Sequence, residues 1–135
     1  MNRESIVSAA WSYIDVPYLH QGRSRLGVDC AGLLMCVAYD MGIKDVRISD
    51  YGRSPDANRA RTIIEEHMER IRFSELEIAD VLSFVILNDV QHYGIVTQMD
   101  PIRFVHSYQT VGKVIEQALV DPWLRRVRGC YRFPE

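Results

Sequence analysis

Three side chains of the sequence have the types that thiol catalysis requires, Cys30, His92 and His106. A cysteine nucleophile needs a base within hydrogen-bond reach, and the base needs a third polar group that fixes its tautomer. His92 and His106 lie in successive strand-like segments, and neighbouring antiparallel strands can hold two imidazoles side by side. These residues are therefore a candidate nucleophile, base and orienting group, although spacing alone also allows purely structural roles.

The surroundings of Cys30 favour the reactive interpretation. Asp29 is a good N-cap and Gly42 suits the end of a helix, so we expect a helix over residues 30–41. A sulfur in the first turn faces free N–H groups and a partial positive charge, which favour the thiolate. The alternative is a small apolar residue that fills a gap in the core.

Two further helices are expected before the strands begin. Apolar residues at helical spacing predict a helix over residues 3–14, which Pro17 ends. Residues 18–28, with two glycines, are expected to be irregular. A third helix should start after Ser54, which can cap it, with Pro55 in its first turn. Its core-facing residues are expected to be Ile63, Ile64 and either Met68 or Ile71.

The second half of the chain has the composition of strands, rich in Val, Ile, Tyr and Phe and punctuated by turn residues. Strands are expected over residues 81–87, 91–98, 102–108, 113–117 and 124–133. Helices followed by consecutive strands favour an α+β fold, with the helices packed on a mostly antiparallel sheet of five or six strands. Because the chain has no repeat, low-complexity tract or linker, residues 1–135 are expected to form one domain.

Composition and charge are those of a soluble globular protein, with 47% hydrophobic residues, 25% charged residues and a formal net charge of -2. This balance argues against wholesale binding to nucleic acid or anionic lipid. No signal peptide and no membrane span are expected. An arginine cluster near the end of the chain is either a solvated strand face or a contact surface. It comprises Arg125, Arg126, Arg128 and Arg132.

The remaining cysteines and histidines carry no recognisable site. Three scattered cysteines do not make a disulfide framework or a zinc knuckle, so we expect free thiols made in a reducing compartment, with no metal and no cofactor. Cys36 and Cys130 lie inside a helix and a strand pattern and are expected to fill gaps. His20 and His67 are given structural or solvent-facing roles.

Three blocks of the sequence resemble the signatures of the NlpC-type papain-like cysteine peptidases. Pro17 and Tyr18, then Gly22, then residues 29–33 (Asp-Cys-Ala-Gly-Leu) are similar to the family's nucleophile block. Residues 79–84 followed by 92–96 are similar to the block that carries the base. Residues 104–107 (Phe-Val-His-Ser) are similar to the block that carries the orienting residue. The order Cys, His, His is that of the family, and the match extends over nearly the whole chain.

The resemblance implies a role for each matching residue. Cys30 attacks the scissile carbonyl, His92 takes and returns the proton, and His106 orients His92. Tyr18 matches a tyrosine whose hydroxyl helps to bind the oxyanion, together with the backbone N–H of Cys30. Asp29 is expected to cap the helix that supports the nucleophile.

The sequence departs from the family's usual pattern at three positions, Ala31 for serine, Ala79 for glycine and Tyr93 for a small aliphatic residue. None of these changes removes a catalytic group, so they bear on the shape of the substrate pocket. The family mostly cleaves peptidoglycan stem peptides, commonly between D-γ-glutamyl and the diamino acid that follows. The resemblance therefore implies this activity.

The chain also resembles the compact members of the family that tailed phages and gene transfer particles encode. Residues 50–55, 115–119 and 123–134 carry this likeness. It implies a virion protein, made in the host cytoplasm, with tail hub or tip proteins as partners. Two alternatives stay open: a structural tail-tip protein whose activity is latent or lost, and a thiol amidase or acyltransferase on a non-wall substrate.

Overall fold

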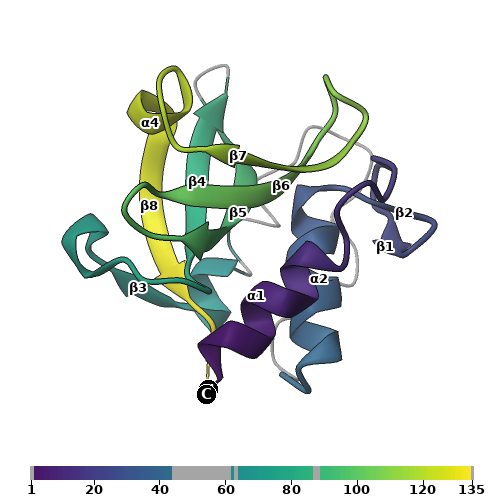
Figure 1. Cartoon of the computed structure of the whole chain (residues 1–135), viewed down its shortest axis with the longest axis horizontal. Helices are drawn as coiled ribbons and strands as arrows, with labels where there is room; N and C mark the ends of the chain where they lie inside the picture. Colours follow the sequence, from purple (N-terminus) through teal and green to yellow (C-terminus); the bar gives the residue numbers. More distant parts are fainter. Residues whose placement is uncertain (1, 44–61, 63, 87–88, 135) are drawn as a thin grey trace.

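The computed structural model describes residues 2–43, 62, 64–86 and 89–134, with the side chains of residues 89–91 excepted. Within these ranges, two main helices, α1 (Arg3–Trp11) and α2 (Cys30–Asp40), lie together beside a six-stranded sheet (Figure 1). The sheet has the order β3-β8-β4-β5-β6-β7, and every pairing in it is antiparallel. Its strands are β3 (Glu69–Ile71), β4 (Val81–Ile86), β5 (Asp89–Gln98), β6 (Arg103–Tyr108), β7 (Lys113–Ala118) and β8 (Val127–Arg132). The expected α+β architecture is confirmed.

The helix boundaries follow from local capping. The Asn2 side chain accepts the N–H of Ser5 at the start of α1. The chain then leaves the helical path after Trp11, because the N–H groups of residues 13 and 14 bond to carbonyls three residues back and Asp15 has φ 74°. The helix is therefore shorter than the expected range 3–14. At the end of α2, Gly42 has φ 72°, a conformation that favours glycine, as predicted.

The segment that leads to α2 is more ordered than expected. Instead of an irregular stretch, β1 (Arg23–Ser24) and β2 (Gly27–Val28) form a small antiparallel hairpin. The hairpin closes tightly, since a Cβ on Gly22 would lie 2.4 Å from the carbonyl oxygen of Gly27. A Cβ on Gly32 would lie 1.9 Å from the carbonyl oxygen of Gly22. Backbone packing between glycines thus fixes this loop against the first turn of α2.

Two further expectations need correction. Ile71 lies in β3 and not in a helix, because the helical residues 62 and 64–67 end before Met68. Ile64, Met68 and Ile71 are nevertheless buried, as a core-facing role requires, while Ser54, Pro55 and Ile63 lie outside the described residues. The range 124–133 is not all strand, since the short helix α4 (Trp123–Arg126) precedes β8.

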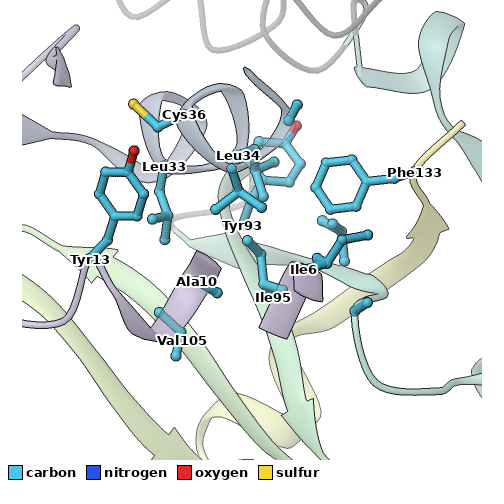
Figure 2. Packing of buried hydrophobic residues seen from close by; sticks show 14 of the residues in the cluster. Ile6, Ala10, Tyr13, Leu33, Leu34, Cys36, Tyr93, Ile95, Val105 and Phe133 are labelled. Carbon is cyan, nitrogen blue, oxygen red and sulfur yellow. The ribbon is translucent and has the colours of Figure 1, made fainter. Parts of the chain in front are cut away.

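The sheet has a core on each face. On one face, α1 and α2 pack against β5 and β6, where Leu33 and Leu34 of α2 meet Tyr93, Ile95 and Val105 of the strands (Figure 2). Full burial of a leucine side chain contributes roughly 1.5–3 kcal/mol, so this face anchors α2 firmly. The other face carries a second cluster, which includes Phe84, Phe104 and Trp123 of α4.

A buried carboxylate joins the two ends of the described chain. Asp80 is fully buried and accepts hydrogen bonds from Arg3 at 3.1 Å and from Arg132 at 3.0 and 2.9 Å. Glu77 also pairs with both arginines, at 3.2 and 3.3 Å. Because a buried charge is tolerated only when it is paired, this network ties α1, the start of β4 and β8 to one another.

Candidate active site

Cys30 is the first residue of α2, at the position that the capping pattern predicted. The N-cap Asp29 is buried, and its Oδ1 accepts the N–H of Gly32 at 2.7 Å. Its Oδ2 accepts the N–H of Gln21 at 2.8 Å, from the loop that precedes the hairpin. Asp29 thus fixes both the helix start and the neighbouring loop, and Cys30 lies half-buried at the N-terminus of the helix.

The Cys30 sulfur accepts backbone N–H groups, among them that of Tyr93, the residue next to His92. Burial, followed by the charge of Asp29, raises the pKa of the Cys30 thiol to about 12, and these N–H groups only partly oppose the rise. The resting group is therefore a neutral thiol. The thiolate expected from the helix terminus is not favoured at rest, because burial outweighs the helix N–H groups.

The two histidines lie side by side, as the strand pattern predicted. Nε2 of His92 on β5 is 2.6 Å from Nδ1 of His106 on β6, and both side chains are buried. Burial and the nearby His106 lower the pKa of His92 well below its ordinary value. Burial lowers the pKa of His106 to about 4. At neutral pH both imidazoles are uncharged, so His92 is available to accept a proton.

The far nitrogen of the second imidazole has its own partner. Nε2 of His106 lies 2.9 Å from Oε1 of Gln117, which belongs to β7. Gln117 lies within residues 115–119, which carry part of the phage-like resemblance, but no role was predicted for it. Its polar side chain in the strand that follows the one with His106 was the feature that could have indicated a partner for His106.

An aromatic wall encloses the histidine pair. The ring of Trp123 lies 5.3 Å from that of His92, tilted by 45°, and 4.9 Å from that of His106, at an interplanar angle of 76°. Phe84 and Tyr108 complete the enclosure at 5.9 and 5.7 Å from His92. These rings limit access of water to the His92–His106 contact, which strengthens that hydrogen bond. Trp123 was not predicted from the sequence to lie at this position.

Tyr18 lies within electrostatic reach of the nucleophile. Burial raises the pKa of its hydroxyl to about 12, and the charge of Asp29 acts in the same direction. The backbone N–H of Tyr18 donates to the carbonyl of Gly112 at 2.8 Å, and the backbones of Tyr18 and Val28 form an isolated parallel β-bridge. The half-buried phenol therefore stays protonated and can donate a hydrogen bond.

A serine connects the two halves of the site. The buried Ser107, next to His106, donates its hydroxyl to the carbonyl of Val28 at 2.7 Å. Val28 comes two residues before Cys30 in the chain. The strand that carries the second histidine is thereby bonded directly to the segment that presents the sulfur.

The site residues predicted from the sequence form two groups. Tyr18, Asp29 and Cys30 interact with one another, His92 and His106 contact each other, and the backbone N–H of Tyr93, the residue after His92, bonds the Cys30 sulfur. The two groups together contain a thiol, a neutral base and donors that suit an oxyanion.

The other cysteines and histidines lie apart from this region. Cys36 and Cys130 are buried in the two separate cores, and His20 and His67 are exposed. Within the described residues, no group of three or more His, Cys, Asp or Glu side chains could hold a metal ion. No helix in the same part of the chain is long and apolar enough to cross a bilayer.

Comparison with known proteins identifies the fold. The chain is similar to an NlpC/P60 family protein from Bacillus cereus (TM-score 0.76, 18% identity, 98% of this chain and 40% of that one). It is also similar to the NlpC/p60 domain of the peptidoglycan hydrolase SagA (TM-score 0.70, 20% identity, 98% of this chain and 100% of that one). A third similar structure is the peptidoglycan hydrolase RipB from Mycobacterium tuberculosis (TM-score 0.72, 18% identity, 98% and 65%).

No family model matches the sequence, and no curated protein matches it. The chain spans 40% of the length of the Bacillus cereus protein and 65% of that of RipB. The fold is that of the NlpC/P60 proteins, as the resemblance in the sequence implied.

Proposed function

We propose that the protein is a cysteine peptidase that cleaves the stem peptides of peptidoglycan. The observation that carries the proposal is the 2.6 Å contact between His92 and His106, together with the backbone N–H of Tyr93, the next residue in the chain after His92, which bonds the Cys30 sulfur. A thiol with an oriented, uncharged base is the minimal apparatus for acyl transfer. The fold is that of the NlpC/P60 proteins, and one of the similar structures, SagA, is a peptidoglycan hydrolase, which supports peptidoglycan as the substrate.

The mechanism starts from the neutral pair and not from a preformed ion pair. As the Cys30 sulfur attacks the scissile carbonyl carbon, His92 removes the thiol proton. The backbone N–H of Cys30 and the Tyr18 hydroxyl donate to the developing oxyanion. His92 then passes its proton to the leaving amine as the C–N bond breaks and a thioester remains. A water molecule, deprotonated by His92, hydrolyses the thioester and restores the thiol.

The proposed substrate is the bond between D-γ-glutamyl and the diamino acid that follows it. The support is the resemblance of the three sequence blocks and the likeness to SagA and RipB, which are described as peptidoglycan hydrolases.

We place the protein in the tail tip of a phage or phage-like particle, with tail hub or tip proteins as partners. The support is the likeness in sequence of residues 50–55, 115–119 and 123–134 to compact phage-encoded members. In this setting the enzyme is synthesised in the host cytoplasm and meets the wall during infection.

The test is digestion of purified peptidoglycan by the wild type and by Cys30→Ala, with the products identified by mass spectrometry. Cys36→Ala is the matched control, since Cys36 is a thiol of the same helix that lies in the core. We expect new D-γ-glutamyl termini from the wild type and from Cys36→Ala, and none from Cys30→Ala. Absence of cleavage by all three proteins would refute the proposal and favour a structural role, and cleavage of an amide outside the stem peptide would favour an amidase.

A further inference from the structure

A chain of polar side chains runs across three adjacent strands on the face of the sheet opposite α1 and α2. His92 lies on β5, His106 on β6 and Gln117 on β7. The register pairs Phe104 with Gln117 and His106 with Ile115, so Gln117 is the diagonal neighbour of His106. Diagonal neighbours on one face are within reach of long side chains. Two successive contacts, of 2.6 and 2.9 Å, link the three residues.

The direction of these hydrogen bonds follows from the chemistry of the groups. A carboxamide oxygen can only accept, so the 2.9 Å contact requires the proton of His106 to be on Nε2. An uncharged imidazole carries one N–H, and therefore Nδ1 of His106 has a lone pair. The 2.6 Å contact then requires Nε2 of His92 to donate to that lone pair. This leaves the lone pair of His92 on Nδ1.

We infer that Gln117 is a positioning residue that sets the tautomers of His106 and His92 and thereby makes Nδ1 of His92 the basic atom. This inference rests on the proposed function, because a basic Nδ1 matters only if His92 deprotonates Cys30. A donor in place of the Gln117 oxygen would reverse both hydrogen bonds and place the proton of His92 on Nδ1. The orienting role of His106 thus depends on Gln117, because an imidazole can either accept or donate.

The neutrality of Gln117 is as important as its oxygen. A carboxylate at this position would stabilise a charged His106, whose two N–H groups both donate. A charged His106 would donate from Nδ1 to Nε2 of His92 and force the proton of His92 onto Nδ1. The Gln117 amide supplies an acceptor without this charge, in keeping with the pKa of His106 at about 4.

The direct test is nitrogen-15 NMR of the histidine side chains at neutral pH, which distinguishes the two tautomers without any catalytic assay. In the wild type we expect the proton on Nε2 in both His92 and His106. In Gln117→Leu we expect His106 to populate both tautomers. Gln98→Leu is the matched control. Gln98 is exposed, lies at the end of β5, and donates to the carbonyl of Pro101. A proton on Nδ1 of His106 in the wild type, or unchanged tautomers in Gln117→Leu, would overturn the inference.

Kinetics provide the second readout. For Gln117→Leu we expect kcat to fall about tenfold, the size of one net hydrogen bond, with KM unchanged. For Gln117→Glu, which preserves the shape, we expect the acid limb of the pH–kcat profile to move up by about one pH unit or more. Wild-type kcat and an unshifted limb in these variants would contradict the inference. If the wild type showed the expected tautomers but cleaved no peptidoglycan, the proposed function would fail and the tautomer assignment would stand.

Discussion

Acidification from pH 6.5 to about 4 should destabilise the folded protein through the buried histidine pair. In the folded state, burial lowers the pKa of His106 to about 4, and it lowers the pKa of His92 well below the ordinary value of 6.5. In the unfolded chain both histidines take up a proton near pH 6.5. Between these two pH values the unfolded state therefore binds more protons than the folded state, and stability falls as the pH falls.

The magnitude follows from the lowered pKa of His106. A change from 6.5 to about 4 corresponds to about 3 kcal/mol, at about 1.4 kcal/mol for each pKa unit. The stability is complete above pH 6.5 and is lost progressively as the pH falls toward 4. His92 adds to the loss in the same direction. Because a small domain is stable by only about 5–15 kcal/mol, such a loss is a substantial fraction of the total.

The assay is urea unfolding of the wild type, His106→Gln and His67→Gln at several pH values across this window. His106→Gln keeps an oxygen that can accept from His92 but removes one of the two buried titrating groups. We expect its unfolding free energy to depend less steeply on pH than that of the wild type by about 3 kcal/mol over the window. The exposed His67 provides the matched control, and His67→Gln should follow the wild type. Parallel curves for all three proteins would refute the reasoning.

Three further substitutions test other parts of the structure. Asp80→Asn leaves Arg132 without its buried carboxylate and should lower the unfolding free energy by about 3–5 kcal/mol, measured by urea unfolding. Gly32→Ala forces a Cβ against the carbonyl oxygen of Gly22 and displaces the start of α2. It should therefore lower the melting temperature and reduce kcat. Unchanged values of both would contradict this packing. Tyr18→Phe removes one oxyanion donor and should reduce kcat about a hundredfold, with little change in the melting temperature.

The features that the sequence predicted well depend on local chemistry. The start of α2 follows from Asp29, whose carboxylate accepts an N–H of the first turn, and its end follows from Gly42, whose φ of 72° favours glycine. The side-by-side histidines follow from two successive strands joined by a short turn, since such strands pair as neighbours. These relations need no knowledge of the rest of the fold.

The features that the sequence missed depend on distant parts of the chain. Ile71 fits a helical spacing as well as a strand, and pairing with Cys130 of β8 decides for the strand. Gln117 reaches His106 only through the register of β6 and β7, which the sequence does not specify. The raised pKa of Cys30 comes from burial, a consequence of tertiary packing that a helix N-cap does not reveal.

The central claim is that Cys30 performs peptide hydrolysis with His92 as its base. The most direct measurement is mass spectrometry of the peptidoglycan fragments that the wild type and Cys30→Ala produce in heavy-oxygen water. We predict that only the wild type produces fragments and that each new carboxyl terminus carries one heavy oxygen atom from water. Equal cleavage by Cys30→Ala, or no cleavage by the wild type, would contradict the claim.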